Sequence, residues 1–151
     1  MLLNERIESA FRDASALGSH VFVFILIVFA YLIGLKLLSL QLLVAVVLSY
    51  FIIMIIRTFY FRNRPVKEKF NSFFSKIDSS SFPSAHSSRG IIILILLSKY
   101  FNNLYLTLFL SFCTLVLIYS RLRLKKHFFS DILAGAILGV VISLFVLRVV
   151  Q

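Results

Sequence analysis

The sequence is poor in the residues that build disulfides and water-soluble surfaces. One cysteine, Cys113, occurs in 151 residues, so no disulfide can form within the chain. Only 15% of the residues are charged while 60% are hydrophobic, and the mean hydropathy is +0.99. A soluble domain of this length carries far more polar surface. The composition therefore indicates an integral membrane protein.

Acidic residues are also scarce. Six Asp and Glu oppose sixteen Lys and Arg, which leaves a net charge of +10. Such a balance suits a nucleic acid, an anionic lipid surface or an anionic substrate as partner. Nucleic acid is the weakest of the three, because the cations flank apolar segments and no recognition motif is present. We expect the partner to be the membrane bilayer and a lipid with an anionic headgroup.

Five stretches are apolar over about the length that a spanning helix needs, roughly 20 residues. They lie at about 19–35, 39–56, 86–101, 103–120 and 130–150. Arg89 and Lys99 shorten the third stretch, but long basic side chains can snorkel to the interface. The pattern predicts an all-α bundle of about five transmembrane helices, in one domain over residues 1–151.

Residues 1–18 differ from the rest. Charges between Asn4 and Asp13 occupy the place of a secretory signal's apolar core, so no such signal is expected. Four apolar residues recur at helical spacing: Leu3, Ile7, Phe11 and Ala14. This pattern predicts an amphipathic helix, either lying in the membrane interface or capping the bundle.

Three polar motifs interrupt the apolar sequence. They are Arg57 followed after six residues by Arg64-Pro65; Pro83-Ser84-Ala85-His86; and Ser120-Arg121, five residues, His127, three residues, Asp131. Between the second and third motifs the chain crosses the membrane twice and returns, so both lie on one face. Arg57 ends the second span on that face. The three motifs are therefore predicted to be neighbours.

The 57–85 connection is the only long polar one. Phenylalanines and lysines alternate in it, namely Phe70, Phe73, Phe74, Lys67, Lys69 and Lys76. This mixture suits a segment that dips into the headgroup layer, and long loops in small proteins are usually functional. Thirteen of the sixteen basic residues lie on the motif face, all except Lys36, Lys99 and Arg148.

The basic residues in the motifs suit phosphate. Arginine stays charged and donates two parallel hydrogen bonds to an oxyanion, so Arg57, Arg64 and Arg121 are candidate phosphate ligands. Each one alone could instead be a cation that snorkels to lipid headgroups. That second interpretation is preferred for four other basic residues: Arg62, Arg123, Lys125 and Lys126.

The second motif opens a helix. Proline suits the first turn, and the free N–H groups there favour an anion. Ser84 adds a hydroxyl group, and His86 follows where it could reach a leaving oxygen. A serine-rich helix cap with an interfacial histidine is the alternative.

In the third motif His127 and Asp131 are four residues apart, which predicts that they share one side of the last helix. A carboxylate beside an imidazole fixes its tautomer and makes it a better base or nucleophile. An exposed i,i+4 pair is the alternative. His20 has no evident partner and is interpreted as interfacial.

The three motifs together resemble the type 2 phosphatidic acid phosphatase family of membrane lipid phosphatases. The family pattern is lysine, six residues, Arg-Pro; Pro-Ser-Gly-His; and Ser-Arg, five residues, His, three residues, Asp. The matching stretches here are 57–65, 83–86 and 120–131, within a resemblance over about 39–151. Arg57 replaces the usual lysine and Ala85 the usual glycine. The first of the six helices in larger members has no counterpart unless 1–18 substitutes for it.

The resemblance implies a role for each motif residue. His127 would attack phosphorus, Asp131 would orient it, and His86 would protonate the leaving oxygen and then activate water. The phosphoryl oxygens would be bound by Arg57, Arg64, Ser84, Ala85 and Arg121. No metal or other cofactor is implied.

The same resemblance implies a substrate class and a location. The substrate would be a lipid phosphate or diphosphate, such as lipid A, undecaprenyl diphosphate or phosphatidylglycerophosphate. The positive-inside rule would place the motif face in the cytoplasm. Bacterial relatives place it outside, so we expect an inner-membrane protein with a periplasmic site. Two alternatives remain: a non-catalytic protein that binds or transports anionic lipids, and a metal site made from His86, His127 and Asp131.

Overall fold

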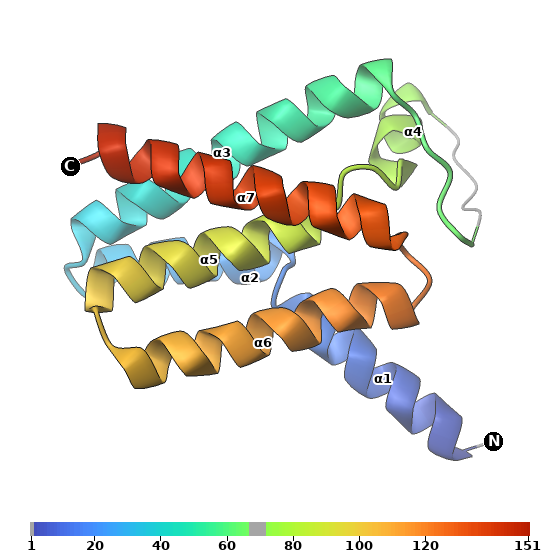
Figure 1. The fold of residues 1–151 in the computed structure, drawn as a ribbon, viewed down its shortest axis with the longest axis horizontal. Helices are drawn as coiled ribbons and strands as arrows, with labels where there is room; N and C mark the ends of the chain where they lie inside the picture. The colour runs from blue at the N-terminus through green and yellow to red at the C-terminus, as the bar shows by residue number, and fades with distance from the viewer. Residues whose placement is uncertain (1, 67–71) are drawn as a thin grey trace.

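The computed structural model describes residues 2–66 and 72–151, and this part of the chain contains seven helices and no strand. The helices are α1 (Leu2–Ala16), α2 (His20–Leu32), α3 (Lys36–Phe59), α4 (Phe73–Ser79), α5 (Ala85–Phe101), α6 (Leu104–Arg123) and α7 (Phe129–Val149). Figure 1 shows α2, α3, α5, α6 and α7 side by side as a bundle. The predicted all-α fold is confirmed.

Three of these helices are long and apolar enough to cross a membrane, namely α3, α6 and α7. A fourth span is possible if α1 and α2 are counted together, although the pair is bent by 43°. With 13 and 17 residues, α2 and α5 are shorter than the roughly 20 residues of a typical span. The count of five spans therefore stays a prediction.

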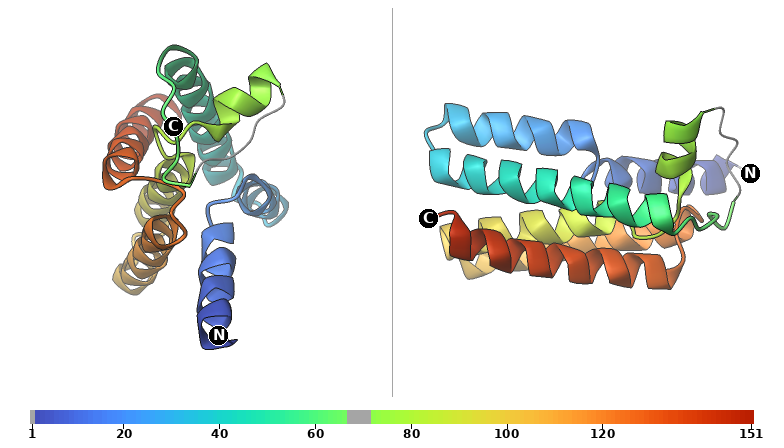
Figure 2. Two further views of the ribbon diagram at one scale, coloured as in Figure 1. Left: turned by 90° about the vertical axis from the view of Figure 1, so that its right-hand side faces the viewer. Right: turned by 90° about the horizontal axis from the view of Figure 1, so that it is seen from above.

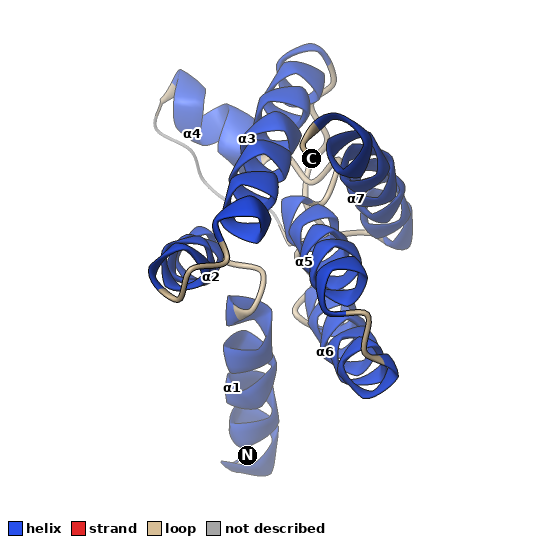
Figure 3. Cartoon of the chain, turned by 90° about the vertical axis from the view of Figure 1, so that its left-hand side faces the viewer, coloured by secondary structure: helices blue, strands red, loops and turns tan. Residues whose placement is uncertain are grey.

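At the centre of the bundle, α5 packs against α3, α6 and α7, while α2 packs on α3 (Figures 2 and 3). Their contacts form an apolar core that includes Leu42, Ile92, Leu96 and Val146, all fully buried. The turn between α5 and α6 is tight because Asn102 adopts the left-handed conformation and the Asn103 side chain caps α6. This turn makes the two helices antiparallel neighbours, as the sequence predicted.

Two glycines let α7 approach the start of α5. A Cβ atom on Gly135 would stand 2.3 Å from the carbonyl oxygen of Ser84, and one on Gly139 would stand 2.6 Å from that of Ser88. Only glycine leaves room for backbone contact of this kind. The second motif is therefore held directly against α7, the helix in which the third motif ends.

The N-terminal helix α1 packs on α6. The rings of Phe11 and Tyr119 meet edge to face with centroids 5.5 Å apart, and Arg121 Nη1 donates to Ser15 Oγ at 2.6 Å. These contacts favour the cap over the helix lying free in the interface. The side chain of Leu3 is outside the described part.

The connection between α3 and α5 begins with an extended segment and ends after the short helix α4. Its two sides are joined by hydrogen bonds from Ser81 N to the Arg62 carbonyl (2.8 Å) and from Arg62 N to Ser80 Oγ (3.2 Å). All six of the interleaved phenylalanines and lysines predicted to reach the headgroup layer lie outside the described residues or side chains, namely Lys67, Lys69, Phe70, Phe73, Phe74 and Lys76.

Candidate active site

The three motifs meet at one end of the bundle. Figure 1 shows the end of α3, the start of α5, the end of α6 and the start of α7 together on its right-hand side, next to α4. The prediction that motifs far apart in sequence become neighbours is confirmed for the elements that carry them.

His127 precedes α7 and is not part of it, because the helix begins at Phe129. The prediction that His127 and Asp131 share one side of a helix is therefore wrong. Nδ1 of His127 lies 2.7 Å from the carbonyl oxygen of Ser81, and the side chain is buried. A carbonyl oxygen only accepts hydrogen bonds, so Nδ1 carries the proton and Nε2 keeps a lone pair.

Asp131 is completely buried and is linked to His127 through Ser81. Its Oδ2 accepts hydrogen bonds from the Ser81 hydroxyl and from Phe128 N, the latter at 2.8 Å. Its Oδ1 accepts from Arg62 Nη1 at 2.6 Å. The carboxylate thus holds Ser81, and the Ser81 carbonyl in turn orients the imidazole. This chain of contacts replaces the direct carboxylate–imidazole pair expected from the sequence.

The second motif is attached to the same residues through its backbone. Ser84 N donates to the Asp131 carbonyl oxygen at 2.9 Å. The Ser84 hydroxyl caps α5 by accepting from Ser87 N, and it also accepts from the Ser87 hydroxyl at 3.0 Å. A buried serine hydroxyl and the first N–H groups of α5 therefore lie beside the segment that holds His127.

Ala85 and His86 form the first turn of α5, and both are half-buried. His86 packs against the α1–α2 junction, since a Cβ atom on Gly18 would lie 3.0 Å from its Cδ2. The alternative for this motif was a serine-rich helix cap with an interfacial histidine. The cap is present, and the histidine lies inside the bundle end, against Gly18.

The three predicted phosphate-binding arginines reach this region from different elements. Arg57 on α3 donates from Nη1 to the Asp78 carbonyl (3.2 Å) and from Nη2 to the Pro83 carbonyl (3.1 Å). Arg64 Nη2 also donates to the Asp78 carbonyl, at 3.0 Å. Arg121 comes from the last turn of α6. Arg57 and Arg121 are buried, at 6% and 8% exposure, and Arg64 is half-buried.

The surroundings of His127 keep its imidazole neutral. The pKa of His127 is lowered to about 3, first by burial and next by the nearby charge of Arg121, while the hydrogen bond to the Ser81 carbonyl raises it. The charges of Arg64 and Arg57 also lower this pKa. All three candidate phosphate-binding arginines are therefore close enough to His127 for their charges to lower its pKa.

Positive charge exceeds negative charge inside this end of the bundle. Three arginines are buried there, Arg57, Arg89 and Arg121, and Asp131 is the one buried carboxylate in the described part of the chain. Asp131 is already paired with Arg62. Buried charges need a partner or a strong network of hydrogen bonds. The site is thus suited to a multiply charged anion.

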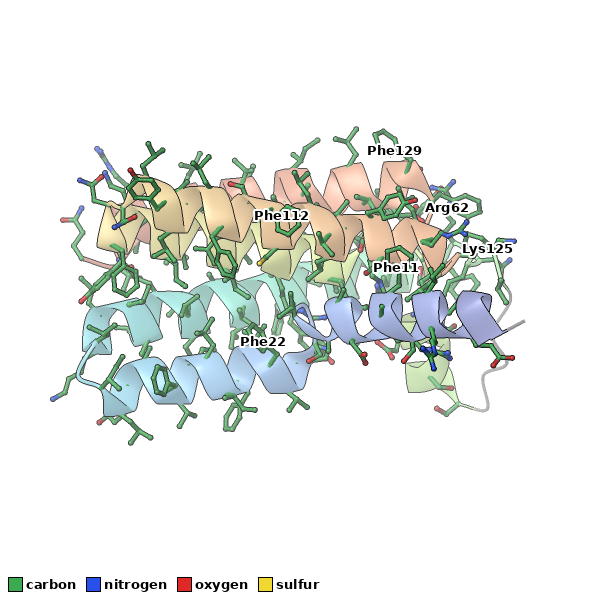
Figure 4. All side chains as sticks on the ribbon, turned by 90° about the horizontal axis from the view of Figure 1, so that it is seen from below. Phe11, Phe22, Arg62, Phe112, Lys125 and Phe129 are labelled. Atoms are coloured by element: carbon green, nitrogen blue, oxygen red, sulfur yellow. The ribbon has the colours of Figure 1, made fainter. Side chains whose placement is uncertain are left out.

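Sequence reasoning missed several residues of this network. Arg62 (labelled in Figure 4) was interpreted as a snorkelling cation, yet it pairs with Asp131 and its guanidinium carbon lies 4.3 Å from the centre of the Phe128 ring. No role was predicted for Ser81, which links Asp131 to His127. The sequence carries no signal for either, because the contacts join residues about 50 and 69 positions apart.

Arg89 and His20 were also misinterpreted. Arg89 was expected to snorkel and His20 to have no partner. Instead Arg89 is 4% exposed, and its Nη1 lies 2.7 Å from His20 Nδ1. Arg89 and His20, which each look isolated in the sequence, are thus hydrogen-bonded to one another inside the bundle.

The metal-site alternative finds no support among the residues that the structure describes. No three His, Cys, Asp or Glu side chains there are grouped as a metal ion would require. The arrangement instead offers a neutral imidazole, a second histidine and several guanidinium groups, which is chemistry suited to phosphoryl transfer.

Two solved structures have a fold similar to that of this chain. The fold is similar to the crystal structure of LpxE from Aquifex aeolicus, with a TM-score of 0.79 and 24% identity over 94% of this chain and 86% of that one. It is also similar to the PAP2 type phosphatidylglycerolphosphate phosphatase from Bacillus subtilis, with a TM-score of 0.74 and 20% identity over 95% of this chain and 76% of that one. No curated protein matches the chain in sequence.

A family model supplies the remaining evidence. The model described as the PAP2 superfamily matches residues 38–151, which is well over half of the chain and contains all three motifs. This match supports a phosphatase acting at a membrane. With its three motifs gathered at one end of a helical bundle of the same fold, the chain belongs to the PAP2 superfamily.

Proposed function

We propose that this protein hydrolyses the terminal phosphate of a membrane lipid phosphate or diphosphate without a metal ion, through a phosphohistidine at His127. The observation that carries the proposal is the state of this imidazole. It is buried and neutral, and its Nδ1–H is held by the Ser81 carbonyl, so that Nε2 keeps its lone pair. The charges of three guanidinium groups lower the pKa of this same imidazole, namely those of Arg57, Arg64 and Arg121.

In the first step Nε2 of His127 attacks phosphorus. His86 takes up a proton together with the phosphate, whose negative charge stabilises the imidazolium. A P–N bond forms as the bond from phosphorus to the lipid oxygen breaks, and His86 donates this proton to the leaving oxygen. The imidazole gains positive charge, which the Ser81 carbonyl and the Asp131 carboxylate behind it stabilise. Arginines around His127 neutralise the charge on the non-bridging oxygens.

In the second step water replaces the histidine. His86, now neutral, takes a proton from the water molecule as its oxygen attacks phosphorus. The P–N bond breaks, inorganic phosphate leaves, and both histidines return to their starting protonation states. Two displacements thus share one nucleophile and one proton carrier.

The substrate proposed is a lipid with an anionic headgroup and a tail that stays in the bilayer. Lipid A, undecaprenyl diphosphate and phosphatidylglycerophosphate are the candidates, and one solved structure of similar fold is that of a phosphatidylglycerolphosphate phosphatase. The excess of buried arginines favours a large or doubly phosphorylated headgroup. The proposed location is the bacterial inner membrane, with the site facing the periplasm.

The test is phosphate release by the purified protein in detergent containing EDTA. The three lipids are assayed in parallel, with His127→Ala as the matched inactive variant. Release that persists with EDTA and is lost in His127→Ala supports the histidine mechanism and ranks the substrates.

A ³²P label from the lipid that stays on the acid-quenched wild-type protein, and is absent from the variant, would identify the phosphohistidine. If no lipid is hydrolysed while all three still bind, the chain is a non-catalytic lipid-binding protein and the proposal fails.

A further inference from the structure

We propose that an apolar cavity between α2, α5 and α6 binds a hydrocarbon chain of the lipid whose phosphate is hydrolysed. This inference rests on the proposed function and extends it to the substrate's tail. The cavity has a volume of about 230 Å³. Phe22 and Leu26 line it from α2, Cys113 and Leu117 line it from α6, and Gly90 lies on the α5 side.

The cavity wall is suited to hydrocarbon. Thr114 carries the one hydroxyl group among its lining residues, and this hydroxyl donates to the Gly90 carbonyl at 3.4 Å. The wall therefore presents methyl, methylene and ring groups, a glycine backbone and one thiol. A ligand with polar groups would leave those groups without partners here.

The arrangement of the helices explains why this space exists. The helix α2 packs on α3, while α6 packs on α5 and on α1. The space between α2, α5 and α6 is the cavity. Figure 4 views this side of the bundle, with Phe22 labelled on α2 and Phe112 labelled on α6. At Gly90, α5 has no side chain, and a Cβ atom there would still be 3.5 Å from Thr114 and Leu117.

One end of the cavity adjoins the candidate active site. Leu117 lines the cavity, and its Cδ1 would be 2.9 Å from a Cβ atom on Gly18. His86 Cδ2 would be 3.0 Å from the same point. Leu117 and His86 thus both lie against Gly18, so the chain of a lipid whose phosphate lies beside His86 is within reach of the cavity.

Any bilayer lipid could offer a chain, but the substrate has an advantage. Once its phosphate is bound, its own tail is held near the cavity at a high effective concentration. Lipid tails are already out of water, so the cavity contributes packing and orientation and no hydrophobic transfer. Its effect should therefore appear as discrimination between chain lengths.

The first experiment uses the chain's single cysteine as a reporter. Alkylation of Cys113 by N-ethylmaleimide is followed in detergent, with inorganic phosphate, dioctanoyl phosphatidate or dipalmitoyl phosphatidate added. Protection by dipalmitoyl phosphatidate, weaker protection by the short-chain lipid and none by phosphate are expected. Equal alkylation rates in all three would overturn the inference. This readout needs no turnover, so it is separate from a failure of the proposed activity.

The second experiment fills the cavity. Cys113→Phe places a ring inside it, and Leu115→Phe places the same ring on the exposed lipid face of α6, where Leu115 is 65% exposed. Cys113→Phe should lower kcat/KM for dipalmitoyl phosphatidate relative to the dioctanoyl lipid by about tenfold. Leu115→Phe should leave this ratio as in the wild type.

A variant that is less disruptive guards against misfolding. Gly90→Ala adds one methyl group at ordinary contact distance and should shift the chain-length ratio in the same direction, by about twofold to threefold. If both cavity variants keep the wild-type ratio while hydrolysis is intact, the tail lies elsewhere. If the wild type hydrolyses neither phosphatidate, the alkylation experiment alone decides the cavity.

Discussion

Arg57 makes two hydrogen bonds that a lysine would make less well. Its two Nη atoms donate to the carbonyl oxygens of Asp78 and Pro83 and so hold the segment before α5. A lysine ammonium is a single point and lacks this planar fork. The arginine at a position where the family usually has lysine therefore has a structural use in this chain.

Replacement of Arg57 by lysine should lose one of these contacts. A hydrogen bond to a charged group contributes about 1.5 to 3 kcal/mol, so Arg57→Lys should lower the unfolding temperature in detergent and reduce kcat/KM by about tenfold. Arg123→Lys, at an exposed position, is the control. An Arg57→Lys protein as stable and active as the wild type would show that the 78–83 segment is held by other contacts.

His127 makes stability depend on pH in a defined direction. Its pKa is lowered to about 3 in the folded protein, against about 6.5 in an unfolded chain. Above pH 6.5 both states are neutral, and His127 adds no pH dependence. Between pH 6.5 and 3 the unfolded state binds the proton more readily, so stability falls as the pH falls.

The variant His127→Asn keeps a donor for the Ser81 carbonyl and cannot titrate. Its unfolding temperature, measured at a series of pH values from 7 to 4, should therefore decline less steeply than that of the wild type. Parallel curves for the two proteins would mean that the imidazole is not kept neutral by its surroundings.

Ala85 shows that a departure from a family pattern need not cause strain. It is the first residue of α5, and the non-glycine residues with positive φ in the described part of the chain are Asn102 and Lys125. The backbone at Ala85 is thus one that any residue adopts. A glycine here would bring freedom that this conformation does not need.

At the scale of elements, the contact between α5 and α7 sets the position of the second motif. Gly135→Ala would place a methyl group 2.3 Å from the Ser84 carbonyl oxygen and push the two helices apart. The expected result is a clear drop in unfolding temperature together with loss of phosphate release, because Ser84 and His86 move away from His127.

Gly90→Ala is the matched comparison for stability. Both substitutions gain about 1 kcal/mol of helix propensity, but a Cβ atom on Gly90 meets its neighbours at 3.5 Å. Gly90→Ala should unfold at the wild-type temperature or above it. Equal stability of both variants would show that the α5–α7 contact adjusts without cost.

At the scale of the whole molecule, the side of the membrane that holds the site decides which lipid leaflet supplies the substrate. In the proposed orientation the motif end of the bundle faces the periplasm and the α2–α3 turn faces the cytoplasm. In a Cys113→Ala background, Arg123→Cys reports the location of the motif end and Lys36→Cys that of the α2–α3 turn. Both side chains are exposed.

A membrane-impermeant maleimide added to intact spheroplasts should label Arg123→Cys and spare Lys36→Cys. Lysis should then make Lys36→Cys reactive. The opposite pattern would place the site in the cytoplasm, as the distribution of basic residues by itself suggests.

What the sequence by itself determined was the class of protein, the long helices and the meeting of the three motifs, while the short helix α4 inside the 57–85 connection was not predicted. Apolar stretches of spanning length and two short turns leave few topologies, and an antiparallel pair must return the third motif to the face of the second. These features depend on local composition and on the parity of crossings, both of which are readable along the chain.

Only the tertiary structure decided the contacts inside the site. The pairing of Asp131 with Arg62, the link from Asp131 through Ser81 to His127, and the pairing of Arg89 with His20 all join residues far apart in sequence. A basic residue beside an apolar segment has the same local pattern whether it faces lipid or the bundle interior. Which of the two it does depends on helix rotation and packing, and these are properties of the assembled bundle.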